Sequence, residues 1–294
     1  VTLSGSNTLR VRVEDAAGNA SAGITQSYTL DTTVASPTIA LSSDSGTSST
    51  DKITNVGVVN VTGLESGSTW EYSTDNGTSW LSGTGSSFGV SGEGVKTVLV
   101  RQTDVAGNTS TGSYTFTVDS TSPVGPTVGL LSDSGTDGTD KLTKVGTVTV
   151  GSLESGATWQ YSTNGGTTWT TGSGSSFTVS GDGVKAVLVR QTDVAGNTSV
   201  DSTYTFTLDT TVASPTIALS SDSGTSSTDK ITNVGVVNVT GLESGSTWEY
   251  STDNGTSWLS GTGSSFGVSG EGVKTVLVRQ TDVAGNTSTG SYTF

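Results

Sequence analysis

Thr69-Trp70-Glu71-Tyr72-Ser73 and Thr78-Ser79-Trp80-Leu81 flank the turn Asp75-Asn76-Gly77, and together they have the pattern of a β-hairpin. Asn-Gly is a strong hairpin signal because both residues accept positive φ. Further strands are predicted outward from this hairpin, at residues 37–41, 56–61, 87–90, 95–103 and 113–118. Seven short strands separated by turn signals are typical of an immunoglobulin-like β-sandwich, with a small barrel as the alternative.

This pattern is repeated along the chain. Asp31 to Phe116 recurs unchanged as Asp209 to Phe294, and a diverged copy lies between them. A unit of about 90 residues can bury a small core of its own, whereas a solenoid turn cannot. We therefore predict an all-β protein of tandem immunoglobulin-like sandwiches, arranged end to end as an extended rod, with repeats at 31–118, 119–208 and 209–294.

Residues 1–30 align with the end of a repeat, because Val11 to Asn19 matches Val100 to Asn108. We expect them to be the C-terminal strands of a preceding truncated immunoglobulin-like repeat. Such a remnant cannot close a sandwich alone. Either the sequence is a window of a longer array, or another chain supplies the missing strands.

Composition excludes several functions. The net charge of −14, from 26 acidic and 12 basic residues, disfavours nucleic acid and anionic membranes as partners. Cysteine, histidine and methionine are all absent, which removes disulfides, thiolate or imidazole metal ligands and the usual catalytic triads. No apolar run approaches the ~20 residues of a membrane helix, so no membrane insertion is expected in this segment. We do not expect an enzyme.

The acidic residues fall at the predicted ends of each sandwich. In this topology, the second-to-third and sixth-to-seventh strand loops lie at the same end as the N-terminus, which gathers Asp31, Glu65, Asp104 and Asn108. The opposite end carries the first-to-second and fifth-to-sixth loops. These hold Asp44 and Asp51, and the next linker begins there with Asp119.

Stacking repeats end to end would bring one acidic end against the next, and clustered carboxylates call for a cation. Carboxylate, Asn and backbone oxygens are the ligands that Ca²⁺ prefers, in sets of six to eight. Aspartate and asparagine also favour loops by bonding their own backbone, which is the alternative explanation. The candidate calcium ligands are Asp31, Asp44, Asp51, Glu65, Asp104, Asn108, Asp119, Asp133, Asp140, Glu154, Asp193, Asn197, Asp209, Glu243, Asp282 and Asn286.

Three motifs recur in order through the repeats. They are the linker Asp31-Thr32-Thr33, with its variant Asp119-Ser120-Thr121-Ser122-Pro123; the loop from Asp44-Ser45-Gly46 to Asp51-Lys52-Ile53-Thr54-Asn55; and Asp-Val-Ala-Gly-Asn-Thr-Ser. With these motifs, the whole chain resembles the bacterial immunoglobulin-like repeats of giant cell-surface adhesins of the RTX type, exported by type I secretion.

The resemblance implies an extracellular stalk at the cell surface that supports adhesion and biofilm formation. Calcium would lie between neighbouring repeats, and other regions of the protein would bind a surface polysaccharide or a host or abiotic surface. The sequence departs from this expectation at three lysines beside the acidic loop, Lys52, Lys141 and Lys230. Their positive charge would repel a cation and so weaken an ion site in that loop.

Two other functions stay open. We expect Trp70 to be a core residue, but Trp80, Trp169 and Trp258 would form an exposed row suited to stacking on sugars if their strand is at an edge. The chain would then be a carbohydrate- or surface-binding module that recognises polysaccharide or ice. Identical units also present identical surfaces, which favours self-association into filaments or a biofilm matrix.

Overall fold

The computed structural model describes residues 5–294, and these residues form β-strands without any helix. It follows that no described segment is a helix able to cross a membrane. Residues 1–4 of the predicted remnant lie outside the described range. The chain divides into two compact units, one of residues up to Pro123 together with Thr192–Thr198, the other of Val124–Gln191 together with Ser199–Phe294.

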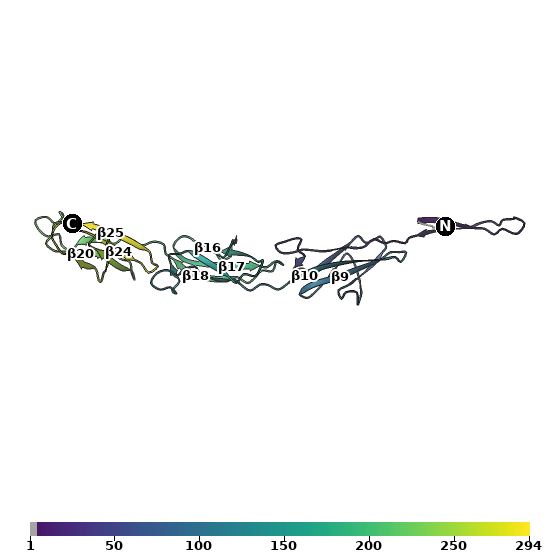
Figure 1. Cartoon of the computed structure of the whole chain (residues 1–294), viewed down its shortest axis with the longest axis horizontal. Coiled ribbons are helices and arrows are strands. Elements are labelled where there is room, and N and C mark those ends of the chain that lie inside the picture. The colour runs from purple at the N-terminus through teal and green to yellow at the C-terminus, as the bar shows by residue number, and fades with distance from the viewer. Residues whose placement is uncertain (1–4) are drawn as a thin grey trace. The chain divides into compact units, whose positions relative to one another are not determined.

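The first complete repeat is a sandwich of two sheets. One sheet has the order β3-β5-β8, and the other has the order β4-β10-β9-β6-β7. Strands β9 and β10, labelled in Figure 1, are the longest of this repeat. They pair antiparallel along their whole length, with Val98 opposite Tyr114. The strands are β3 (Thr38–Leu41), β4 (Ile53–Thr54), β5 (Val58–Thr62), β6 (Thr69–Ser73), β7 (Leu81–Ser82), β8 (Ser87–Gly89), β9 (Gly94–Thr103) and β10 (Thr109–Val118).

The second repeat has the same two sheets, β11-β13-β16 and β12-β18-β17-β14-β15. Its strands are β11 (Thr127–Leu130), β12 (Leu142–Thr143), β13 (Thr147–Gly151), β14 (Thr158–Ser162), β15 (Thr170–Thr171), β16 (Ser176–Thr178), β17 (Gly183–Thr192) and β18 (Ser202–Leu208).

The third repeat has sheets β19-β20-β23 and β22-β21-β24-β25. Residues 231–232, which match β4 of the first repeat, are not in a strand. The strands here are β19 (Thr216–Leu219), β20 (Val236–Thr240), β21 (Thr247–Ser251), β22 (Leu259–Ser260), β23 (Ser265–Gly267), β24 (Thr275–Thr281) and β25 (Thr287–Thr293).

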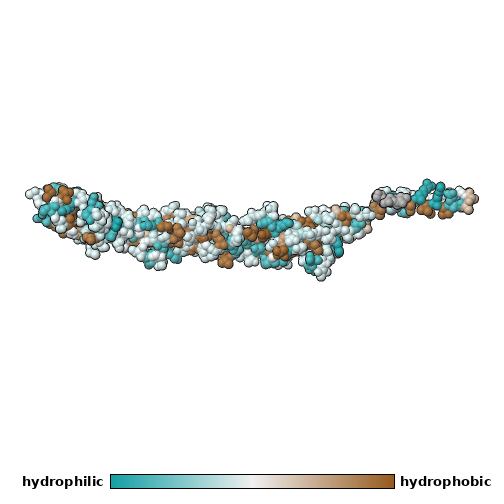
Figure 2. All heavy atoms as spheres, in the orientation of Figure 1, coloured by the Kyte–Doolittle hydropathy of each residue, from teal (hydrophilic) through white to brown (hydrophobic). Residues whose placement is uncertain are grey.

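Each repeat buries its own core between its two sheets. In the first repeat, alternate residues of β5 and β9 face inward, and Val59, Val98 and Val100 are fully buried. Burying one such side chain contributes about 1.5–3 kcal/mol. Trp70 is also a core residue, as predicted, and a Cβ on Gly83 would lie only 2.1 Å from its ring. The face of the chain in Figure 2 is mostly hydrophilic or intermediate, with separate hydrophobic patches.

Three strand predictions need correction. The hairpin at Asp75-Asn76-Gly77 is present, but β7 begins only at Leu81, because the Asp75 side chain accepts bonds from Ser73 Oγ and Ser79 N–H and holds the loop open that far. Strand β10 begins at Thr109, four residues before the predicted start at 113. The two-residue strand β4 was not predicted, and it pairs parallel to the end of β10.

Strands β1 (Gly5–Val11) and β2 (Ile24–Leu30) form a hairpin with the register of β9 and β10. Leu9 lies opposite Gln26, as Val98 lies opposite Tyr114. The side chains of the β1–β2 hairpin are mostly exposed, however. Val11 is 57% exposed, whereas its counterpart Val100 is fully buried. The hairpin therefore keeps the local strand pairing of a repeat without the sheet that would cover its apolar face.

Candidate functional site

At one end of the first repeat, a buried glutamine joins three segments. Gln102 Oε1 accepts the N–H of Glu65 at 3.0 Å, and Gln102 Nε2 donates to the Ala35 carbonyl at 2.6 Å. The Glu65 carboxylate in turn accepts the Ala35 N–H at 3.0 Å. The two bonds of the glutamine side chain recur at Gln191 and Gln280. The glutamate bond recurs in the third repeat, where Glu243 accepts the Ala213 N–H. The role of these glutamines was not predicted. The sequence does contain a signal for it, because each glutamine is a polar residue on the inward face of a strand.

The Asp-Val-Ala-Gly-Asn loop at this end is closed by its own side chains. Asp104 Oδ1 accepts the Asn108 N–H and Oδ2 accepts Asn108 Nδ2, both at 2.8 Å. These bonds, led by the Asn108 side chain, lower the pKa of Asp104. Asn108 Nδ2 also donates to the Asp31 carbonyl at 3.1 Å. The loop thus orders itself and also holds the start of the linker.

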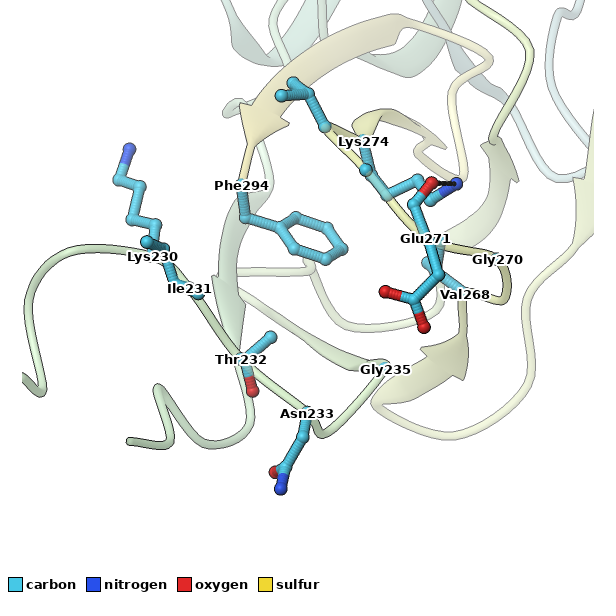
Figure 3. A pocket seen from close by; sticks show the side chains of 12 residues that line it. Lys230, Ile231, Thr232, Asn233, Gly235, Val268, Gly270, Glu271, Lys274 and Phe294 are labelled. Atoms are coloured by element: carbon cyan, nitrogen blue, oxygen red, sulfur yellow. Dashed lines mark hydrogen bonds between the residues drawn. The ribbon is translucent and has the colours of Figure 1, made fainter. Parts of the chain in front are cut away.

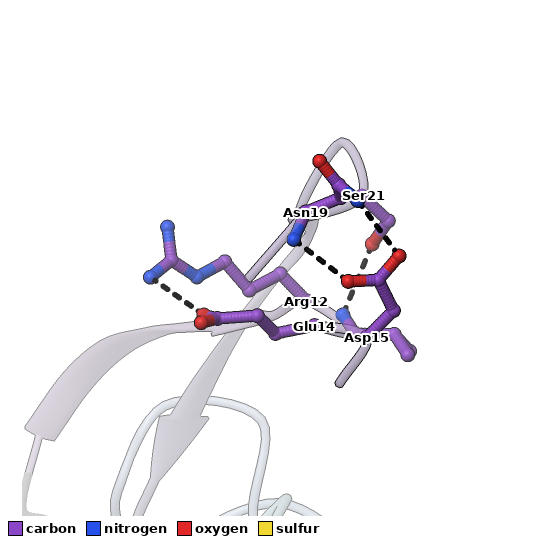
Figure 4. A network of polar contacts seen from close by, with 6 residues as sticks. Arg12, Glu14, Asp15, Asn19 and Ser21 are labelled. Carbon is purple, nitrogen blue, oxygen red and sulfur yellow. Dashed lines mark hydrogen bonds and ion pairs between the residues drawn. The ribbon is translucent and has the colours of Figure 1, made fainter. Parts of the chain in front are cut away.

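The β1–β2 hairpin shows that this loop forms without a surrounding sandwich. Asp15 Oδ1 accepts the N–H of Asn19, and Oδ2 accepts the Asn19 side chain (Figure 4). Oδ1 also accepts the N–H of Ala17. Arg12 and Glu14 make an exposed ion pair beside it, at 3.6 Å. The aspartate and asparagine of the motif therefore have a structural role in the loop itself.

At the opposite end, the loop after β3 is held by two aspartates. Asp44 Oδ2 accepts the N–H of Lys52 at 3.0 Å, and Asp51 Oδ1 accepts the N–H of Ile53 at 3.0 Å. Lys52 adopts a φ of 62°, and its ammonium lies over the Tyr114 ring, 4.9 Å from the centroid. The same cation–π contact recurs at Lys141 and Lys230. These lysines thus have an aromatic partner beside the acidic loop.

Within the first compact unit, this loop contacts the Asp-Val-Ala-Gly-Asn loop of the second repeat. Ser45 Oγ donates to the Ala195 carbonyl at 2.6 Å, and a Cβ on Gly46 would lie 2.0 Å from the Val194 carbonyl oxygen. Ala195 is fully buried, whereas Ala106, at the same place in the first repeat, is exposed. The local sequence is identical, so the contact between the loops causes the difference.

The second unit contains the same contact one repeat further along. Ser134 Oγ donates to the Ala284 carbonyl at 2.7 Å, and Ala284 is fully buried. Lys144 replaces the asparagine found at position 55, and its ammonium donates to the Gly285 carbonyl at 2.5 Å. We call these two contacts, Ser45–Gly46 with 194–196 and Ser134–Gly135 with 283–285, the joints.

The linker aspartate of each joint is bonded on both sides. The Asp119 N–H donates to the Thr54 carbonyl of the first repeat at 2.9 Å, and the Asp119 carbonyl accepts Asn197 Nδ2 of the second repeat at 2.8 Å. Asp209 is held in the same way, by Thr143 and Asn286. The Asp119 carboxylate accepts the Thr121 N–H at 3.1 Å. The backbone of the linker is thus fixed at the point where one repeat passes into the next.

The joints bring some predicted calcium ligands together and leave others apart. Asp193 and Asn197 bond to each other and lie next to the contact made by Ser45. Glu65 and Glu243 instead bond the N–H groups of Ala35 and Ala213 within their own repeats, and Glu154 donates its N–H to Gln191. Among residues 5–294, no three acidic side chains gather as a possible metal site.

One atom per repeat nevertheless suits a cation. Asp44 Oδ1, Asp133 Oδ1 and Asp222 Oδ1 are buried and accept no hydrogen bond. A buried carboxylate oxygen without a partner is costly, and a cation would satisfy it. Since Ca²⁺ also accepts backbone carbonyl and Asn oxygens, the residues present fit an ion bound by few carboxylates and several carbonyls. They do not fit a carboxylate-rich cage.

The tryptophans of the predicted sugar-binding row are partly buried and covered. The Arg101 guanidinium lies 4.3 Å from the centroid of the Trp80 ring and pairs with Glu71 at 2.6 Å. Arg279 and Glu249 repeat this over Trp258, and Arg190 lies 3.8 Å from the Trp169 centroid. One face of each ring is therefore occupied by an arginine.

The two-sheet topology defines the class of the chain as tandem immunoglobulin-like β-sandwiches. No protein-family model and no curated protein matches the sequence. Among solved structures, the chain is similar to a Ca²⁺-stabilised adhesin with which an Antarctic bacterium binds ice, at 23% identity over 98% of this chain and 80% of that one, with a TM-score of 0.35.

Two further similar structures are also adhesin regions. One is a tetra-tandem repeat from the extending region of a large adhesion protein, at 18% identity over 99% of this chain and 81% of that one, with a TM-score of 0.27. The other belongs to a 1.5-MDa bacterial ice-binding adhesin, at 20% identity over 83% of this chain and 92% of that one, with a TM-score of 0.33. Likenesses at these TM-scores carry no functional conclusion for the chain.

Proposed function

We propose that this chain is a structural extender, the stalk region of a bacterial adhesin that lies outside the cell at its surface. Its domains are the repeats 31–118, 119–208 and 209–294, preceded by the terminal strands of another repeat. The stalk projects ligand-binding regions located elsewhere in the protein and so supports adhesion. The chain performs no catalysis in this account, and its immediate partners are its own neighbouring repeats.

The observation that carries this proposal is the burial of Ala195 and Ala284 in loops whose first copy is exposed. Repeats on a flexible string would leave all copies of the loop equally exposed. Here the loop of each following repeat is covered by a serine and a glycine of the preceding one, and the linker aspartate is bonded on both sides. Each of these contacts restricts bending between successive repeats.

Calcium is the cation that we assign to the joints. Asp44 and Asp133 supply the carboxylate oxygens that lack a partner, and the other candidate residues of the joints contribute carbonyl or amide oxygens. When bound, the ion would link two repeats through one set of ligands. Extracellular modules bind Ca²⁺ with a Kd of about 10⁻⁴–10⁻³ M, so the joints would fill outside the cell. At about 100 times the Kd, each ion would add about 2.7 kcal/mol of stability.

Isothermal titration with Ca²⁺, followed by thermal unfolding, tests this assignment. We expect two ions per chain, one at each joint, and a lower Tm in chelator. Asp44→Asn and Asp133→Asn should each remove one ion. Asp222→Asn should remove none, although Asp222 Oδ1 also lacks a partner, because no loop among residues 5–294 faces Gly224 to complete the ligand set. Binding of three ions per chain would place the site within single repeats. An unchanged Tm in chelator would show that calcium does not stabilise the joints.

A further inference from the structure

The two joints differ in the residue that follows the threonine of the acidic loop. Asn55 of the first repeat and Lys144 of the second each donate the backbone N–H to the serine of their joint at 2.8 Å. The third repeat has an asparagine again, Asn233, whose side chain points away from Phe294 in Figure 3 and accepts the Ser223 hydroxyl at 2.7 Å. The residue at this position therefore lies beside the same serine in every repeat.

The rest of the two joints is closely matched. In each joint, a Cβ on the glycine would lie 2.0 Å from a carbonyl oxygen of the facing loop. The facing loops, 193–197 and 282–286, have the same sequence, and the alanine at the centre of each is fully buried. The second acidic loop also has Asp137 in place of Ser48, but this carboxylate is exposed and bonds Thr139 of its own loop. The difference that reaches the facing loop is therefore the exchange of asparagine for lysine.

Lys144 places a positive charge against the facing loop. Its ammonium donates to the Gly285 carbonyl at 2.5 Å and lies 3.7 Å from where a Cβ on Gly285 would stand. The Asn55 amide nitrogen has the same place in the first joint, 3.5 Å from where a Cβ on Gly196 would stand. Among residues 5–294, Lys144 makes no ion pair with a carboxylate. The second joint thus contains an unpaired ammonium where the first contains a neutral amide.

This exchange affects calcium binding in two ways. Ca²⁺ accepts the amide oxygen of an asparagine as a ligand, whereas an ammonium has only donors to offer. The ammonium of Lys144 also repels a second cation in the same joint, because like charges at close range raise the energy of the bound ion. At the same time, its bond to the Gly285 carbonyl is charge-assisted and joins the second and third repeats without any ion.

We propose, on the basis of the calcium sites assigned above, that Lys144 is a cation built into the second joint and that the two joints therefore respond differently to calcium. The first joint loosens when calcium is removed. The second joint binds calcium at least about tenfold more weakly and keeps its contact without it. The residue after the acidic-loop threonine thus sets the calcium dependence of each joint, with asparagine for a dependent joint and lysine for an independent one.

Isothermal titration of the intact 294-residue protein with CaCl₂ measures each joint separately when the other site is removed. Asp133→Asn leaves the ion of the first joint, and Asp44→Asn leaves that of the second, for which we expect a Kd at least about tenfold higher. Adding Lys144→Asn to Asp44→Asn should lower this Kd by about tenfold, and adding Asn55→Lys to Asp133→Asn should raise the other by as much. Asn233→Lys, the same substitution in the third repeat, should change neither Kd.

Amide hydrogen exchange in chelator tests the contact itself. We expect faster exchange at residues 194–196 when calcium is removed, and unchanged exchange at residues 283–285 unless Lys144→Asn is introduced. Equal Kd values at the two joints, or equally faster exchange of both loops in chelator, would overturn the role of Lys144 and leave calcium at the joints. A protein that binds no Ca²⁺ would instead overturn both this role and the calcium sites on which it rests.

Discussion

Ser45 Oγ donates a 2.6 Å hydrogen bond to the carbonyl of Ala195, which lies 150 residues further along the chain. The same bond joins Ser134 to Ala284 across the same separation. The serine also accepts the N–H of Asn55 at 2.8 Å, so its hydroxyl is oriented by its own loop before it reaches the next repeat. A surface prepared within one repeat is thus complementary to a loop that every repeat carries.

The buried glutamines should be important for stability. In Gln102→Leu, the Glu65 N–H and the Ala35 carbonyl lose their partner. Both belong to exposed residues, so we expect a cost of about 0.5–1.5 kcal/mol for each lost hydrogen bond. We expect the first repeat to unfold at a lower urea concentration, as measured by tryptophan fluorescence. Val13→Gln is the control, because Val13 holds the same position in the exposed hairpin and is 72% exposed. A Gln102→Leu protein as stable as the parent would refute the role.

Acid should destabilise the hairpin loops of the first and third repeats more than that of the second. Hydrogen bonds from Ser79, and from Ser73, lower the pKa of Asp75 from 3.8 to about 2, and Ser257 does the same for Asp253. A folded-state pKa below the unfolded value means that this stabilisation is complete above about pH 4 and is lost as the pH falls toward 2.

The second repeat provides the comparison for this prediction. Asn164 takes the position of Asp75 and accepts the Thr168 N–H at 3.0 Å with a side chain that does not titrate. We therefore expect Asp75→Asn together with Asp253→Asn to reduce the fall in Tm between pH 4 and pH 2. An identical pH dependence in the parent and the double variant would show that these carboxylates do not contribute to it.

Soluble glycans should not quench the tryptophan fluorescence of the chain. The Trp80 ring has an arginine on one face, and that arginine is itself held by Glu71, so stacking of a sugar on that face would have to displace both. Saturable quenching by a polysaccharide, lost when Trp80, Trp169 and Trp258 are all replaced by Leu but kept in Trp70→Phe, would instead support the surface-binding function.

The features that could be predicted from the sequence depend on neighbouring residues. The Asn-Gly hairpin, the inward face of β9 and the core position of Trp70 follow from turn chemistry and from alternation along one strand. Strand β4 could not be found in this way, because two residues carry no periodicity and their pairing partner, at 117–118, is more than 60 residues away. The predicted topology of the sandwich placed Asp31, Glu65, Asp104 and Asn108 at one end, and in the structure Asn108 bonds both Asp104 and the Asp31 carbonyl.

The joints could be predicted only in outline. The sequence indicates that acidic loops meet, but the contacts in the structure are made by Ser45 and Gly46, beside Asp44. A hydroxyl and a glycine with a φ of 96° are common in loops and carry no sign of a partner 150 residues away. The hydrogen bonds of Asp104 and Asn108 within their own loop were among the alternatives. Aspartate and asparagine favour loops because they can bond to the loop itself.

Small-angle X-ray scattering of matched glycine variants tests the central claim, that contacts at the joints fix successive repeats. Gly46 and Gly135 face carbonyl oxygens 2.0 Å from where a Cβ would lie, whereas Gly224, also at positive φ, has open space. All three alanine substitutions strain the backbone, but only those at Gly46 and Gly135 also clash with a carbonyl oxygen. Only these two should therefore change the joints. In millimolar calcium, we predict that Gly224→Ala scatters like the parent, while Gly46→Ala with Gly135→Ala scatters as repeats on flexible linkers. Identical curves for all three proteins would contradict the account.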